Sequence, residues 1–170
     1  HWRDSDGRLS DCCPDEFPGF SIGSDKPQAS RIDLYVDPLC IDSKEFFSTF
    51  LKVFNAKIDG KKVSESFEIY LHYIALPYHY YSFTSIIALK YLQVKYPPGV
   101  IPFLQKMFTN LDVFNRQYGK TEPQAVRRII QGYVKEVLPQ GYPFPSDLFT
   151  DAYREAARIE FKYAMAQRVT

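Results

Sequence analysis

The sequence has few of the residues that mark several common classes of protein. Its 3 cysteines in 170 residues are too few for the disulfide framework of a small secreted domain. The formal net charge of +1 argues against nucleic-acid binding as the main role. No apolar run approaches the ~18 to 20 residues of a membrane span, and the most apolar segment, from Phe83 to Leu92, is interrupted by Lys90. There is no Asn-x-Ser/Thr acceptor, so glycosylation gives no support for secretion.

Apolar and aromatic residues are plentiful instead. Hydrophobic residues make up 45% of the chain and aromatic residues 16%, which is typical of a folded globular protein rather than a disordered one. A chain of 170 residues buries roughly two-thirds of its unfolded surface. One core is therefore feasible, and we expect a single domain.

The cysteines leave several pairings open. Cys12 and Cys13 are adjacent, and adjacent cysteines rarely bond to each other because the ring they would close is strained. A link from Cys12 or Cys13 to Cys40, or to a partner, is at least as plausible. The odd count leaves one thiol free or paired with another molecule.

The segment 31–54 predicts a buried strand, a short turn and an amphipathic helix. Ile32, Leu34 and Val36 alternate with polar or aromatic neighbours, and Pro38 ends this pattern because proline cannot extend a ladder. After Ile41 the apolar residues recur at steps of three and four, which is the period of a helix face. These residues are Phe46, Phe47, Phe50, Leu51, Phe54 and Ile58.

Cys40 thus falls at or just before the start of a helix, where we expect it to be exposed. The unpaired N–H groups of a first helical turn and the helix dipole favour a thiolate at such a position. Lys44 would add to this effect, and Asp42 would oppose it.

A second strand is predicted over 66–76, with the sequence SFEIYLHYIAL. Because apolar residues lie on both of its faces, we expect a central strand, parallel to the first, in a β-α-β unit. Gly60 is expected to end the intervening helix as its C-cap. The first 30 residues contain several prolines and glycines without periodicity, and they predict an extended arm rather than packed elements.

Helices are predicted for most of the remaining chain. Ser82 is expected to cap the helix that follows the turn 78–81. Two further helices follow, one beginning near Pro102 and one after a capping box of Thr121 and Gln124. Ser146 is expected to cap the last helix.

The stretch DPLCIDSK, residues 37–44, and the later ALPYH, residues 75–79, resemble the DsbA-like thioredoxin-fold family of eukaryotic secretory-pathway proteins. The resemblance implies an α/β thioredoxin-like fold with an inserted helical subdomain. It divides the chain into an N-terminal arm over 1–30, a first β-α-β unit over 31–76, a helical insertion over 77–145 and a helix over 146–170 that returns to the sheet. The C-terminal β-hairpin and cis-proline segment of this family are expected to be missing from this chain.

In this family the turn reads Cys-x-x-Cys in the active members, and here it is Cys40-Ile41-Asp42-Ser43. The resemblance implies that Cys40 and Ser43 form a degenerate catalytic site. Dithiol exchange needs a second thiol to release a mixed disulfide. Ser43 cannot supply one, so the site is limited to monothiol exchange or to retention of a partner, with an outside thiol such as glutathione for release.

Partners and compartment follow from the same resemblance. It implies protein or peptide thiols as partners, an assembly partner that completes the sheet, no bound cofactor other than glutathione, and a place in the secretory pathway, including the endoplasmic reticulum, or outside the cell. Tyr78, His79 and Tyr80 are the expected binding residues, because exposed aromatics are good anchors for a partner. His79 falls at the same sheet edge as Cys40, and a Cys-His pair also supports nucleophilic hydrolysis. His72 is expected to be a core histidine.

Two other functions stay open. One is a non-catalytic interaction or scaffold subunit that keeps the fold without using Cys40. The other is a glutathione transferase of the kappa type, which shares the helix-inserted fold and holds the glutathione thiolate at this turn. The sequence shows no glutathione-binding motif that favours the second.

Overall fold

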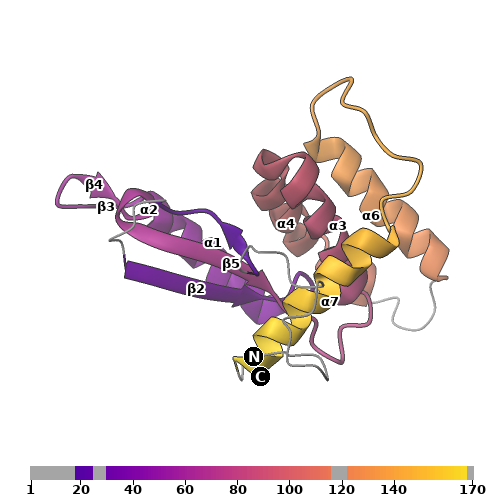
Figure 1. Cartoon of the computed structure of the whole chain (residues 1–170), viewed down its shortest axis with the longest axis horizontal. Coiled ribbons are helices and arrows are strands. Elements are labelled where there is room, and N and C mark those ends of the chain that lie inside the picture. The colour runs from indigo at the N-terminus through magenta and orange to yellow at the C-terminus, as the bar shows by residue number, and fades with distance from the viewer. Residues whose placement is uncertain (1–17, 25–29, 116–121, 168–170) are drawn as a thin grey trace, which may run out of the picture.

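A small mixed sheet and a set of helices make up the fold (Figure 1). The computed structural model describes residues 18–24, 30–115 and 122–167. Most of these residues are helical, so the protein is of the mixed α/β class with a larger α part, as the sequence predicts in outline.

The sheet has the strand order β1-β5-β2, with β1 at Phe20–Ser21, β2 at Ser30–Val36 and β5 at Phe67–Tyr73. β2 and β5 are parallel, and Leu34 lies opposite Leu71. β1 pairs with β5 in the antiparallel direction. The expected parallel β-α-β unit with a central second strand is therefore confirmed. The expected N-terminal arm is wrong in one respect, because part of it is a strand of the sheet.

Helix α1, Ile41–Asn55, connects β2 to β5 together with a short hairpin and a helical turn. The hairpin consists of β3, Lys57–Ile58, and β4, Lys61–Lys62, and α2 at Val63–Ser66 leads into β5. Gly60 has a φ of 81° and lies in the turn of this hairpin. It is not the C-cap of α1, because the helix ends five residues earlier.

The helical part contains α3 and five further segments among the described residues. They are α3 at Ser82–Lys95, η1 at Pro97–Gly99, α4 at Val100–Thr109, α5 at Leu111–Asn115, α6 at Pro123–Val137 and α7 at Asp151–Ala166. The short α5 makes one helix more than the sequence predicts between β5 and the last helix. The tight 3-10 turn η1 explains the end of α3, because Pro97 and Pro98 lack the N–H groups that would continue it.

Helix α3 lies at the centre of the helical part. Every residue from Ser85 to Leu92 is buried, and α3 contacts α4, α6 and α7. The apolar face of α4 is also buried as predicted, through Phe103, Leu104 and Met107. Burial of such side chains is the main source of folding free energy.

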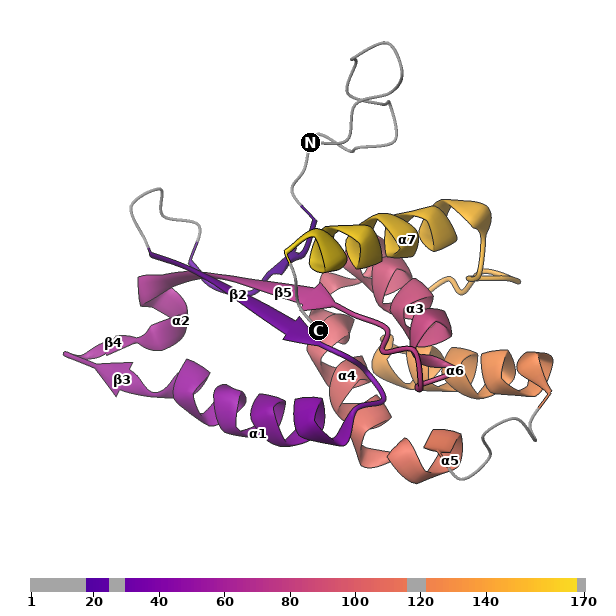
Figure 2. The same cartoon turned by 90° about the horizontal axis from the view of Figure 1, so that it is seen from below.

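The two faces of the sheet are covered by different helices. Figure 2 shows α1 on one side of β2 and β5, and α7 on the other. Only Phe47 of α1 is fully buried, and Phe46 is about half exposed. The predicted apolar face of this helix is therefore only partly used, and Ile58 lies outside it in β3.

Three predicted helix caps are wrong. Ser82 is the first residue of α3, and Tyr81 precedes it as the N-cap. The N-cap of α6 is Glu122, so the predicted capping box does not form; Thr121 itself lies outside the described residues. The N-cap of α7 is Thr150 rather than Ser146. In each case a polar residue near a helix start fits the local sequence rule, but the helix begins at another residue.

No helix in the described part of the chain combines the length and the apolar character that crossing a bilayer requires.

Candidate functional site

The turn between β2 and α1 brings Asp37 and Cys40 together. The backbone N–H of Cys40 donates to the backbone oxygen of Asp37 at 3.1 Å, which closes the turn. The side chain of Asp37 accepts from the backbone N–H of Leu39 at 2.8 Å and so fixes the same turn from inside. Pro38 sits between them, where its missing N–H leaves no donor unpaired.

The side chain of Asp37 connects the segments of this site. Its carboxylate is fully buried, and each of its oxygens accepts two hydrogen bonds. Oδ1 accepts from Leu39 N–H and from the Ser82 hydroxyl, and Oδ2 accepts from Leu76 N–H and from Nδ1 of His79. A buried charge is costly unless its hydrogen-bonding capacity is satisfied. This carboxylate therefore joins the Cys40 turn, the end of the β5 segment and the start of α3.

Cys40 is the N-cap residue of α1, as predicted, and it forms no disulfide among the described residues. Cys12 and Cys13, whose pairing the sequence leaves open, lie outside those residues. The expectation that Cys40 is exposed is wrong, because only 7% of the residue is accessible. The turn is held against the protein by Asp37, and Leu39 beside it is buried. The thiol lies at the positive end of a helix of 15 residues.

Ser43 lies one turn further along α1, and its hydroxyl oxygen accepts from the backbone N–H of Asp37 at 3.1 Å. It stands where a resolving cysteine would stand in a Cys-x-x-Cys site. The hydrogen bond gives Ser43 a structural role, since it ties the first turn of α1 back to the end of β2.

The three predicted binding residues do not behave alike. Tyr78 and Tyr80 are 62% and 63% exposed, so they are available to a partner. His79 lies between them with its ring mostly covered, and its Nδ1 donates to Asp37 at 2.9 Å. His79 and Cys40 are therefore linked through one residue, Asp37, which His79 contacts at the carboxylate and Cys40 at the backbone oxygen. This agrees with their expected place at the same sheet edge.

The structure does not form a Cys-His pair. Within the described part of the chain, the Cys40 thiol makes no hydrogen bond to His79 or to any other group. A histidine that is to remove the thiol proton must lie within hydrogen-bond reach of it. Nor do the described residues contain a group of three or more His, Cys, Asp or Glu side chains that could hold a metal ion.

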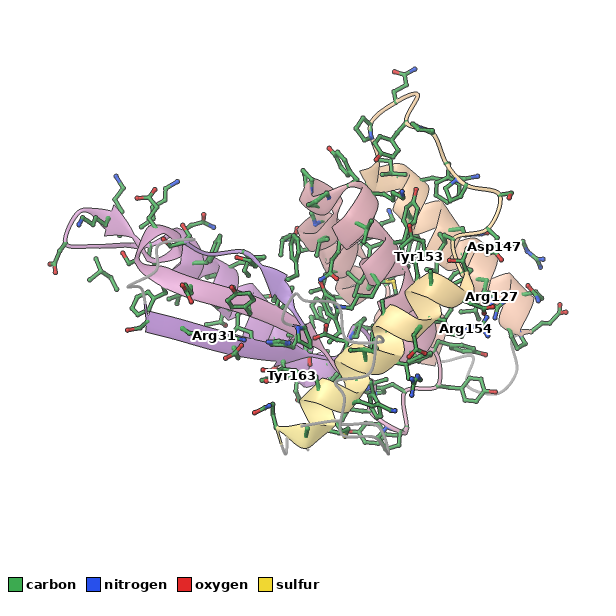
Figure 3. The ribbon with its side chains drawn as sticks, viewed as in Figure 1. Arg31, Arg127, Asp147, Tyr153, Arg154 and Tyr163 are labelled. Atoms are coloured by element: carbon green, nitrogen blue, oxygen red, sulfur yellow. The ribbon has the colours of Figure 1, made fainter. Side chains whose placement is uncertain are left out.

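A second buried polar cluster lies on the α7 face of the sheet. His72 is fully buried, and its Nδ1 and Nε2 lie 2.8 Å from Glu160 and 2.9 Å from Asp33. The ring is stacked between Tyr35 and Tyr163. Figure 3 labels Tyr163 on α7, close to the strand that carries Arg31. The prediction of a satisfied core histidine is confirmed.

The buried acidic side chains of this cluster are paired with basic groups. Burial alone would raise the pKa of Asp33 and of Glu160, but their hydrogen bonds with basic groups hold both pKa values below the ordinary range. Both are therefore carboxylates at neutral pH, and each ring nitrogen of His72 faces one of them. Lys90 completes the cluster through an ion pair with Glu160.

The two carboxylates that organise these clusters have only weak signals in the sequence. Asp37 reads only as the end of a strand before a proline, and Glu160 reads as one charge on a helix. Lys90, a single cation inside an apolar helix, was the one visible sign of a buried ion pair. Such a residue rarely stays buried without a partner.

No protein-family model matches the chain, and neither the curated proteins nor the solved structures contain one that is significantly similar to it.

Proposed function

We propose that the protein is a thioredoxin-like thiol-disulfide exchange protein of the DsbA-like kind, with Cys40 as its single reactive thiol. The observation that carries this proposal is the position of Cys40 as the N-cap of α1, directly after a strand of a parallel β-α-β unit. There the free N–H groups of the first helical turn stabilise a thiolate.

The arrangement of the elements supports the finer fold assignment. A short antiparallel strand, β1, flanks β5 on one side, and β2 flanks it on the other. Helices α3 to α6 stand between β5 and α7, in the place of the inserted helical subdomain. Among the described strands β2 pairs only with β5, so its other edge suits the second hairpin that a thioredoxin-like sheet has.

The chemistry is exchange at one thiol. The Cys40 thiolate attacks one sulfur of a disulfide, a new sulfur–sulfur bond forms, the old one breaks, and the second substrate sulfur leaves as a thiolate. Ser43 cannot reverse this step, because a hydroxyl forms no disulfide. The mixed disulfide lasts until an external thiol such as glutathione attacks it. The low exposure of Cys40 selects for substrates that fit closely against the turn.

The test is the reaction of the protein with oxidised glutathione, followed by intact mass. A Cys12→Ser/Cys13→Ser background removes the other two thiols. We expect one glutathione adduct, formed faster than on free cysteine and reversed by reduced glutathione. Cys40→Ser in the same background must abolish it. The proposal fails if the background protein forms no adduct, or reacts no faster than free cysteine.

One observation favours a second candidate, a non-catalytic interaction subunit. Ile41, Tyr78 and Tyr80 are each more than half exposed around a buried cysteine, which suits a surface that binds a partner without using the thiol. Cys40→Ala decides between the two functions: unchanged capture of a partner favours the subunit, and lost capture favours covalent exchange.

A further inference from the structure

A cavity of about 580 Å³ lies between α3, the loop before α7 and the first turn of α7. Aromatic rings form much of its wall, and two side chains of opposite charge line it as well. These residues are Tyr91, Tyr142, Phe144 and Tyr153, with Lys95 and Asp147. Figure 3 shows Asp147 and Tyr153 together at the N-terminal end of α7. The volume is in the usual range for a small-molecule site.

The walls are held in place by contacts that do not need a ligand. The ring of Tyr91 meets Phe144 at 6.2 Å and Tyr153 at 5.5 Å between centroids, each in an edge-to-face arrangement. The hydroxyl of Tyr142 donates to the backbone oxygen of Lys95, which ties the loop to the end of α3. The cavity is therefore preformed, which lowers the entropic cost of binding.

The hydroxyl of Tyr91 is the main reason to infer a ligand in this cavity. This residue is only 3% exposed, and its hydroxyl has no hydrogen-bond partner among the described residues. Every fully buried side-chain oxygen and nitrogen in that part of the chain has a partner, so this hydroxyl is not fully buried, and Tyr91 lines the cavity. The hydroxyl of Tyr153 is in the same situation. Burial raises the pKa of both groups, so both remain protonated donors at neutral pH.

The cavity is lined by two charged residues of opposite sign, Lys95 and Asp147. The ammonium of Lys95 forms no ion pair with any described residue, so it is available to an anion. Asp147 already accepts from the backbone N–H of Phe149 at 2.8 Å and shapes the loop before α7. Lys95 and the hydroxyls of Tyr91 and Tyr153 thus supply three donors, against one carboxylate, that of Asp147, which is already engaged at Oδ1. An acceptor on the ligand complements the three donors.

We propose that this cavity binds a small aromatic carboxylate. Its ring packs against Tyr91 and Phe144, and its carboxylate accepts from the tyrosine hydroxyls and from Lys95. Aromatic pairs of this kind contribute beyond the area that they bury. The site uses none of the residues around Cys40 and is independent of the exchange reaction.

Isothermal titration of the full chain with 1-naphthoate tests this, with 1-naphthylmethylammonium as the probe of opposite charge. We expect 1-naphthoate to bind and the cation to bind at least about tenfold more weakly. Tyr91→Phe removes only the hydroxyl and should weaken 1-naphthoate about threefold to tenfold. Lys95→Met should weaken it about threefold to fivefold in low salt.

Matched controls lie outside the cavity. Tyr133→Phe in α6 and Lys52→Met in α1 make the same chemical changes and should leave the affinity within about twofold of the wild type. Cys40→Ser should also bind normally, which separates this site from the proposed exchange function. The proposal is wrong if 1-naphthoate does not bind, if the cation binds as tightly, or if neither Tyr91→Phe nor Lys95→Met weakens binding.

Discussion

Nδ1 of His79 lies 2.9 Å from Oδ2 of Asp37, and the carboxylate that it binds has no exposed surface. Asp37 and His79 are 42 residues apart in the sequence. Their contact holds the loop before α3 against the turn that carries Cys40, because both segments bond to the Asp37 carboxylate. The shape of the proposed reactive site therefore depends on a residue that does no chemistry in it.

The first prediction concerns this carboxylate. Asp37→Asn places an amide N–H₂ among four hydrogen-bond donors, so at least one donor must lose its partner. We expect the free energy of unfolding to fall by about 2 to 4 kcal/mol in urea denaturation. Asp42→Asn, at an exposed position in the first turn of α1, should change it by less than about 0.5 kcal/mol. Equal effects of the two substitutions would contradict the role given to Asp37.

The second prediction concerns the buried pair of Lys90 and Glu160. Lys90→Met should lower the free energy of unfolding by about 3 to 5 kcal/mol, because it leaves a buried carboxylate with less compensation. Adding Glu160→Gln should cost less in this background than in the wild type, which a double-mutant cycle measures. In the exposed pair Lys106–Glu136, Lys106→Met should cost about 1 kcal/mol or less. Additive single effects would show that Lys90 and Glu160 are not coupled.

The third prediction is a loss of stability in acid. The pKa values of Asp33 and Glu160 are lower in the folded protein than the ordinary 3.8 and 4.5. Between the ordinary and the folded pKa values, the unfolded chain binds more protons than the folded protein does. The contribution of the two carboxylates to the free energy of unfolding is therefore fully present above about pH 5, and it is lost as the pH falls through their folded pKa values. Urea denaturation between pH 7 and pH 3 should show a fall in stability that is smaller in Asp33→Asn.

Asp151→Asn is the control for this profile, because the side chain of Asp151 is fully exposed. Its curve should run parallel to that of the wild type. If Asp33→Asn also ran parallel, the carboxylate would not be part of the acid response.

The fourth prediction concerns Gly19, which has a φ of 111° and donates its backbone N–H to Glu160. A Cβ at this position would lie 2.5 Å from Cε1 of His72. Gly19→Ala should therefore destabilise the protein by about 2 to 4 kcal/mol, through backbone strain and a clash with a ring held on both sides. Gly60→Ala carries similar strain at a φ of 81° but meets nothing within 4 Å, so about 1 kcal/mol is expected. Similar losses in thermal or urea denaturation would show that the clash is relieved.

Local pattern was a good guide where one residue type recurs at a regular spacing. The alternation of Ile32, Leu34 and Val36 predicted β2, and the change of period after Cys40 predicted the start of α1 within a residue. Cap residues were a poorer guide. Ser82 has the right chemistry for an N-cap, yet its hydroxyl donates to Asp37, a partner 45 residues away that no local rule contains.

The sequence by itself predicted the two long strands and the main helices, because hydrophobic period, proline and glycine act over a few residues and leave a readable pattern. The two-residue strands and α5 leave no such pattern. Only the tertiary structure decided which charges are buried and what they hold. Asp37 with His79, and Glu160 with His72 and Lys90, come from separate segments, and each charge is tolerated inside the protein only because its partners arrive from elsewhere. The low exposure of Cys40 has the same origin. The turn that contains Cys40 includes Asp37, and the Asp37 carboxylate is bonded to Leu76 and His79, which are distant in the sequence.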